Sequence, residues 1–188
     1  MTWRFRVKRI ALFAIALLAV STNVLAQAPA DMEKPLLAAP PNLKDGATII
    51  KWKSDFTYDT VRKGTNRLVC FDKSGMPLNQ PFSVECTSVA NLDRVAQNLK
   101  TEAMAADRKA ADAAFEAQEK AGTRVKPEYG SVWYHVMGAD AEHTRKHMTI
   151  AVPGATTATT GLPDNGRQGG VWIMNAGTTT AHLMTPGE

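Results

Sequence analysis

The chain has 188 residues, 44% of them hydrophobic, with 22 lysine and arginine residues against 18 aspartate and glutamate residues. Residues 1–26 hold four of the basic residues and no acidic one, so the rest of the chain has no formal net charge. This balance removes the compositional basis for a nucleic-acid or anionic-membrane partner, because both ligands require a basic surface.

The first 26 residues have the three-part pattern of a secretory signal peptide. Four basic residues precede an unbroken apolar run, Ile10–Val20, and the small residues Val24 and Ala26 stand just before Gln27. The apolar run is too short to span a bilayer as a helix. We therefore expect a cleaved signal peptide over residues 1–26, a periplasmic or extracellular protein, and no integral membrane segment after cleavage.

Residues 27–46 contain four prolines and little apolar periodicity. Because proline fixes φ and removes a hydrogen-bond donor, this stretch is predicted to be an extended arm. It leads to a single domain over residues 47–188.

Two cysteines, Cys70 and Cys86, lie in neighbouring segments of strand composition, residues 67–71 and 82–87. The turn sequence Asp72-Lys73-Ser74-Gly75 follows the first of them. Cysteines of an exported protein pair in an oxidising compartment. The sequence therefore predicts a β-hairpin that is stapled by a Cys70–Cys86 disulfide.

Residues 88–121 change to helical periodicity, with an apolar stripe in the first half and nine alanines from Thr101 to Ala121. We predict one long helix whose first half packs on a sheet and whose second half runs into solvent. A partner-binding coiled coil is the alternative, but no heptad of large apolar residues supports it.

Further strands are expected at residues 48–52, 131–137, 148–152, 170–175 and 180–184, with a short helical turn through residues 142–146. The predicted fold class is therefore α+β: a mainly antiparallel sheet with one long helix and a disulfide-stapled hairpin. The sheet takes strands from both sides of the helix.

Familiar catalytic motifs are absent from the sequence, including the nucleophile elbow, the phosphate-binding loop and the dinucleotide fingerprint. His143 and His147 have the spacing of the zinc-protease motif, but Thr144 occupies the position of its general-base glutamate. A hydrolase of that class is therefore disfavoured.

Histidine and methionine recur together near the C-terminus, as His135 with Met137 and His182 with Met184. Residues i and i+2 of a strand share a face, so each pair can point one way. Imidazole and thioether suit copper, and imidazole suits zinc. These four residues, with His143 and His147, are the candidate metal ligands; ordinary core packing is the competing interpretation.

Trp133 and Trp172 are candidates for lining an apolar ligand pocket, although core packing also accounts for them. The expected function is a non-catalytic exported domain that binds a small molecule or a protein partner. Copper or zinc binding is the alternative, and a hydrolase with an unfamiliar site is a further one.

Two blocks, Arg62–Asn66 followed by Cys70, and Gly169–Met174 followed by Ala181–Met184, resemble a group of uncharacterised secreted bacterial proteins. The resemblance runs in order over roughly residues 48–186. It implies that the two blocks belong to one domain, and it carries over no activity, cofactor or site.

Overall fold

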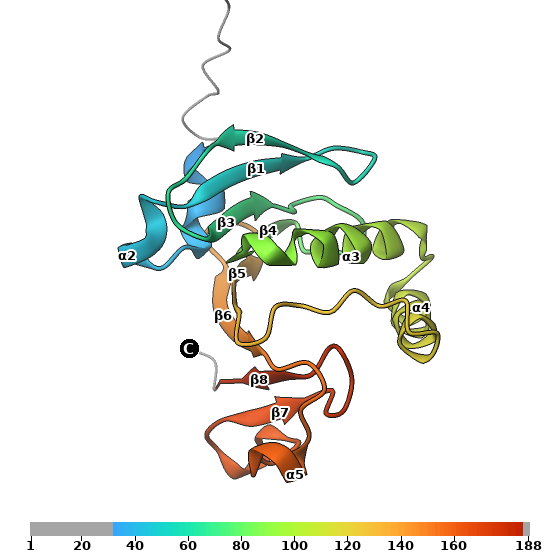
Figure 1. The fold of residues 1–188 in the computed structure, drawn as a ribbon. Helices are drawn as coiled ribbons and strands as arrows, with labels where there is room; N and C mark the ends of the chain where they lie inside the picture. Colours follow the sequence, from blue (N-terminus) through green and yellow to red (C-terminus); the bar gives the residue numbers. More distant parts are fainter. Residues whose placement is uncertain (1–31, 186–188) are drawn as a thin grey trace, which may run out of the picture.

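The computed structural model describes residues 32–185, so the predicted signal peptide lies outside the described part of the chain. Eight strands form one sheet in the order β2-β1-β3-β4-β5-β6-β8-β7 (Figure 1). They are β1 (Thr48–Trp52), β2 (Tyr58–Arg62), β3 (Leu68–Asp72), β4 (Phe82–Ser88), β5 (Val132–Gly138), β6 (Thr144–Ala151), β7 (Trp172–Met174) and β8 (His182–Met184). Every neighbouring pair is antiparallel except β1 with β3. The mainly antiparallel sheet with strands from both sides of the helical segment is confirmed.

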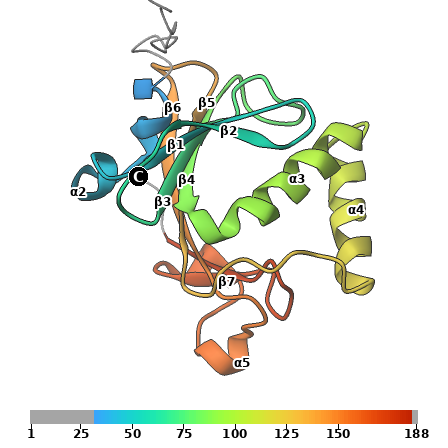
Figure 2. The same ribbon diagram turned by 45° about the horizontal axis from the view of Figure 1, so that its top comes forward.

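The expectation of one long helix is wrong. The chain forms α3 (Leu92–Met104) and α4 (Arg108–Lys120), and α4 turns away from α3 in Figure 2. The backbone of Ala105 is extended, and the Asp107 carboxylate then caps α4 by accepting from the Ala110 N–H at 2.7 Å. No helix within residues 32–185 is both long and apolar enough to cross a membrane.

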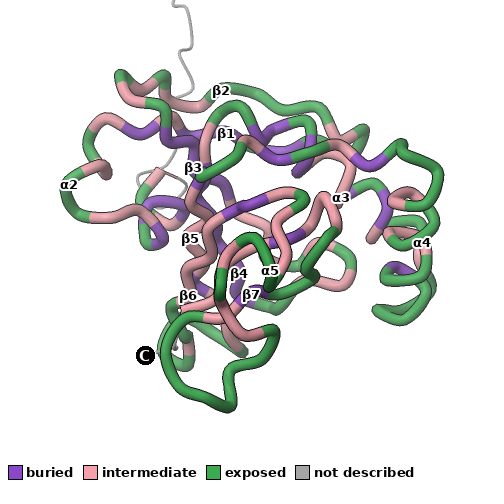
Figure 3. Tube along the Cα trace, turned by 60° about the horizontal axis from the view of Figure 1, so that its bottom comes forward, coloured by how far each residue is buried: buried purple, intermediate pink, exposed green. Residues whose placement is uncertain are grey.

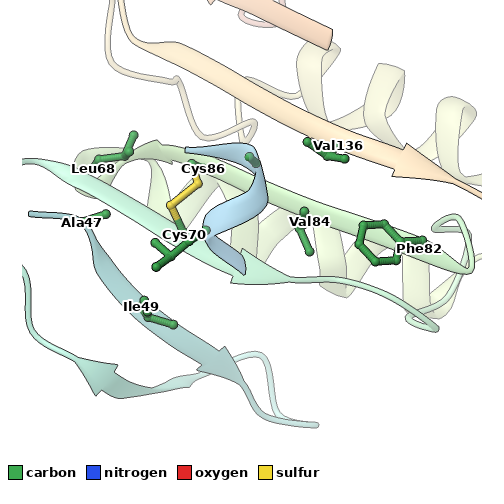
Figure 4. Packing of buried hydrophobic residues seen from close by; sticks show 10 residues of the cluster. Ala47, Ile49, Leu68, Cys70, Phe82, Val84, Cys86 and Val136 are labelled. Carbon is green, nitrogen blue, oxygen red and sulfur yellow. A yellow bond between two sulfur atoms is a disulfide. The ribbon is translucent and has the colours of Figure 1, made fainter. Parts of the chain in front are cut away.

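One face of the sheet is covered by the segment that precedes β1. This segment forms two short helices, η1 (Pro35–Ala38) and α2 (Pro41–Lys44), so the expected extended arm is wrong there. The disulfide between Cys70 and Cys86 has an S–S distance of 2.04 Å (Figure 4), and Leu36 of η1 is buried in the same apolar cluster. The disulfide-stapled hairpin is confirmed, because the two cysteines face each other across β3 and β4.

The opposite face of the sheet is covered by α3. Its apolar stripe, Leu92, Val95 and Leu99, packs against β1 and β3 and beside Trp133 of β5. Helix α4 is mostly exposed, and Ala111 is its one fully buried residue (Figure 3). The prediction that the second half of the helical segment is exposed to solvent is confirmed.

The first resemblance block, Arg62–Asn66, has a structural role. The Arg62 guanidinium donates to the Ala47 carbonyl at 2.8 Å, and the Asn66 amide donates to the Leu43 carbonyl at 2.8 Å. A Cβ at Gly64 would lie 2.2 Å from the Gly46 carbonyl oxygen, so only glycine fits this approach. The block fastens the edge of the sheet to the segment before β1.

The remaining short elements are η2 (Val89–Asn91), which joins β4 to α3, and α5 (Thr157–Thr160) and η3 (Gly166–Gln168), which lie between β6 and β7. A third apolar cluster, built on Val152, Ile173 and Ala181, holds β7 and β8 to the end of β6. The second resemblance block thus forms the edge of the same sheet that carries the first block.

Candidate functional site

A cavity of about 400 Å³ lies between α3 and the half of the sheet formed by β5, β6, β8 and β7. We call it the histidine cavity, because three of the four histidines line it. Its lining comprises Lys73, Glu85, Arg94, Val95, Asn98, Leu99, Glu102, Pro127, Trp133, His135, His147, Thr149, Ala151, Met174, Thr180, Ala181, His182 and Met184. Ten of these eighteen residues are polar or charged, but the exposed surface of the lining is mostly apolar, as is usual for a small-molecule site.

The strand register brings the histidines to one face. His135 of β5 pairs directly with His147 of β6, and their rings stack with centroids 6.1 Å apart. His182 of β8 pairs with Ala151, which lies four residues further along β6 than His147. At about 3.3 Å per residue, this offset separates the backbone of His182 from the backbones of His135 and His147 by roughly 13 Å along the strand direction. Burial is the main cause that lowers the pKa of His182, and the ring of His135 is near enough for its charge to lower that pKa further.

A buried carboxylate, Glu85 of β4, supports His135 from the neighbouring strand. Glu85 is only 2% exposed, and its Oε2 lies 2.6 Å from the Lys73 Nζ and 3.1 Å from the His135 Nδ1. Burial alone raises the pKa of Glu85, but Lys73 and His135 outweigh it and lower that pKa to about 2. Glu85 is therefore ionised at neutral pH.

The hydrogen bonds show which ring nitrogen donates in two of the histidines. An ionised carboxylate and a backbone carbonyl only accept, so the Nδ1 of His135 donates to Glu85 and the Nδ1 of His182 donates to the Thr180 carbonyl at 2.7 Å. In the neutral form of either ring, Nε2 is then the nitrogen that carries the free lone pair. Burial is the main cause that lowers the pKa of His147 and of His182, so both rings are neutral at pH 7.

Five of the eight predicted site residues line the cavity, and the other three do not. His135, His182, Met184 and Trp133 converge there with His147. Trp172, Met137 and His143 are not among the lining residues.

The three predicted residues outside the cavity have other contacts. The Trp172 ring lies over Gly166, where an added Cβ would be 3.3 Å from it. The Sδ of Met137 lies 3.9 Å from the guanidinium of Arg145. His143 is exposed and lies in the turn before β6, with its Nδ1 2.8 Å from Asp140.

The expected helical turn through residues 142–146 is wrong. Asp140 accepts from the backbone N–H groups of Glu142 and His143, and β6 starts at Thr144. His143 and His147 therefore do not share a helix face.

Within residues 32–185, no group of three His, Cys, Asp or Glu side chains is placed to hold a metal ion. Copper or zinc binding thus has no preformed ligand cluster of this kind in the described part of the chain.

Sequence reasoning missed Glu85, Lys73 and Arg94. In the segment 82–87 the alternation places Cys86 in the core and makes Glu85 look solvent-facing. No pattern in the sequence marks Glu85 as buried, because β4 is buried on both faces only once η1 and α3 cover the two sides of the sheet.

Comparison with known proteins does not identify the site. No protein-family profile matches the chain, and no similar curated protein or solved structure was found. Its interpretation therefore rests on the chemistry of the cavity itself.

Proposed function

We propose that this chain is an exported protein that binds a small organic molecule in the histidine cavity. The observation that carries the proposal is the convergence of His135, His147, His182 and Trp133 from three strands around a volume of about 400 Å³. Ligand cavities of proteins span roughly 300–1,000 Å³, so this volume suits a small ligand. Export follows from the predicted signal peptide.

The polar groups favour a ligand that carries hydrogen-bond donors at both ends. The Nε2 atoms of His135 and His182 offer lone pairs, because each Nδ1 already donates to an acceptor. Their strands are offset by roughly 13 Å, which favours an elongated molecule over a compact one. An uncharged ligand fits best, since Lys73 and Glu85 already neutralise each other.

The middle of the cavity favours a flat apolar body. Trp133 pairs with Thr149 and stands between the two histidine positions, and the thioethers of Met174 and Met184 lie in the same lining. Aromatic rings and polarisable sulfur pack well against an aromatic ligand. A planar ligand with terminal hydroxyl groups combines these features.

The rigid aromatic diol 4,4′-dihydroxybiphenyl is a probe with this chemistry, and biphenyl is its control without hydroxyl groups. Isothermal titration calorimetry is expected to show saturable binding of the diol that is at least tenfold weaker in Trp133→Leu and in His182→Gln, which corresponds to about 1.4 kcal/mol. Trp172→Leu is the matched control, because Trp172 lies outside the cavity lining.

Equal affinities of the Trp133→Leu and Trp172→Leu variants would place the diol elsewhere and overturn the proposal. Lack of saturable diol binding by the wild type would overturn it as well. Stoichiometric uptake of copper or zinc that is lost in His182→Gln, combined with no diol binding, would favour the metal hypothesis instead.

A further inference from the structure

Ligand binding alone does not account for the ion pair at the inner end of the histidine cavity. Glu85 is buried as a carboxylate beside Lys73 and below His135. Removing two charges from water costs several kcal/mol per ion unless the pair is compensated, and apolar residues of similar size are often at least as stable. A buried ion pair with this desolvation cost beside a ligand cavity suggests a catalytic role for its residues.

We propose that Glu85 and His135 form an acid–base dyad that hydrolyses an aryl ester bound in the histidine cavity. The inference rests on the proposed function, because it requires a small aromatic molecule in that cavity. His135 is the catalytic residue, and Glu85 is a positioning residue that acts through it.

The orientation of His135 supports the role of general base. The contact of 3.1 Å between its Nδ1 and Glu85 leaves the other ring nitrogen of this cavity-lining residue, Nε2, as the atom that can take a proton. The ionised Glu85 also stabilises the imidazolium that forms after the transfer, as the carboxylate does in serine-protease triads. The stacked His147 is neutral at pH 7 and does not repel that charge.

Lys73 supplies a cation at the same end of the cavity. Its ammonium group has three N–H donors, of which the contact of 2.6 Å with Glu85 uses one. The remaining donors can stabilise the negative charge that develops on a carbonyl oxygen during addition. The site thus provides a base and an oxyanion donor on neighbouring side chains.

The reaction needs no reactant besides water. The water oxygen bonds to the ester carbonyl carbon while a water proton moves to the Nε2 of His135, and the carbonyl electron pair moves to its oxygen near Lys73. The electron pair on that oxygen then re-forms the carbonyl bond, and the bond from carbon to the aryl oxygen breaks as the imidazolium returns the proton to the aryl oxygen. A carboxylic acid and a phenol leave, and both dyad residues return to their starting states.

The test uses 4-nitrophenyl acetate with the full exported protein, and follows release of nitrophenolate at several pH values. His135→Gln is expected to lower kcat/KM about 100-fold, the usual contribution of a general base. This variant leaves the Lys73–Glu85 pair intact. Trp172→Leu, which changes a residue outside the cavity lining, is expected to stay within about threefold of the wild-type rate.

Glu85→Gln tests the positioning role. It is expected to lower kcat with little change in KM and to alter the pH dependence of kcat, which a purely structural role of Glu85 would leave unchanged. Competitive inhibition by 4,4′-dihydroxybiphenyl ties the activity to the cavity.

The outcomes separate the two proposals. If the diol binds but ester hydrolysis does not exceed the buffer rate, or His135→Gln retains the wild-type rate, the dyad is overturned and ligand binding stands. If the ester is hydrolysed in a His135-dependent way and the diol neither binds nor inhibits, the dyad stands and the elongated-ligand proposal fails.

Discussion

Glu85 is the residue that holds Lys73 and His135 in place at one end of the histidine cavity. It joins three strands, because it lies on β4 and contacts Lys73 after β3 and His135 on β5. Removing one partner of a buried ion pair leaves an uncompensated charge, which costs about 3–5 kcal/mol. The same residue therefore governs both the stability of this sheet region and the orientation of the His135 ring.

The protonation of Glu85 is expected to make the free energy of unfolding fall at acidic pH. Its pKa falls from 4.5 to about 2 on folding, so its contribution to stability is complete above pH 4.5 and is lost as the pH falls toward 2. The difference corresponds to about 3 kcal/mol in the free energy of unfolding. Urea unfolding between pH 6 and pH 2 measures it. Glu85→Gln should lack this part of the acid sensitivity, and pH curves that run parallel for both proteins would contradict the assignment.

The sequence alone identified His135 and His182 as site residues, but it did not identify the groups that accept hydrogen bonds from their rings. Alternation along a strand places a side chain on a face, which was enough to pair each histidine with a methionine. Alternation does not tell which strand lies next to which. Glu85 contacts His135 only because β4 pairs with β5, and the two strands are separated in the sequence by α3 and α4. The long-range strand order thus decided the chemistry of the site.

Among the elements, the strands were predictable and the helix break was not. The strand over residues 48–52 and the hairpin of β3 and β4 follow from β-branched composition and turn residues. The break at residues 105–107 interrupts an alanine-rich run in which every residue tolerates a helix. Helix propensity is a weak local preference, and the cap at Asp107 and tertiary contacts override it.

The disulfide is expected to contribute strongly to the β3–β4 hairpin. Cys70 and Cys86 are separated by 16 residues, and both are completely buried. Closing a loop of this length in the unfolded chain corresponds to about 3 kcal/mol. Urea unfolding of the Cys70→Ala/Cys86→Ala double variant should show this loss, and the wild type under reducing conditions should show a similar one. A loss below about 1 kcal/mol would contradict the chain-entropy account.

At the scale of the whole molecule, the cavity depends on a clamp between its covering helix and the far edge of the sheet. Arg94 of α3 is 4% exposed and donates to Thr180 at 2.8 Å and to Thr179 at 3.2 Å in the connection between β7 and β8. It also donates to the Val125 carbonyl, in the segment after α4. Glu119 of α4 accepts from the backbone N–H of Thr179 at 3.1 Å. These contacts join parts of the chain about 85 residues apart, which no local pattern in the sequence specifies.

Replacing Arg94 by methionine, which keeps an apolar stem of similar length, is expected to release this clamp. Burial lowers the pKa of Arg94 to about 10, so the guanidinium is still charged at neutral pH and its hydrogen bonds are charge-assisted. Their loss should reduce the free energy of unfolding by about 2 kcal/mol. It should also weaken binding of the aromatic diol about tenfold, because His182 and Met184 are then held less firmly against α3.

Hydrogen exchange over residues 175–184 distinguishes a released clamp from general destabilisation. Exchange should accelerate there in Arg94→Met, while β3 and β4 keep their protection because their buried residues belong to apolar clusters that do not include Arg94. Arg108→Met is the matched control, since Arg108 forms an ion pair with Glu102 at 2.9 Å but its side chain is half exposed. Equal acceleration across β3 and β4 in Arg94→Met would mean that Arg94 stabilises the domain as a whole, and unchanged diol affinity would show that the cavity does not need the clamp.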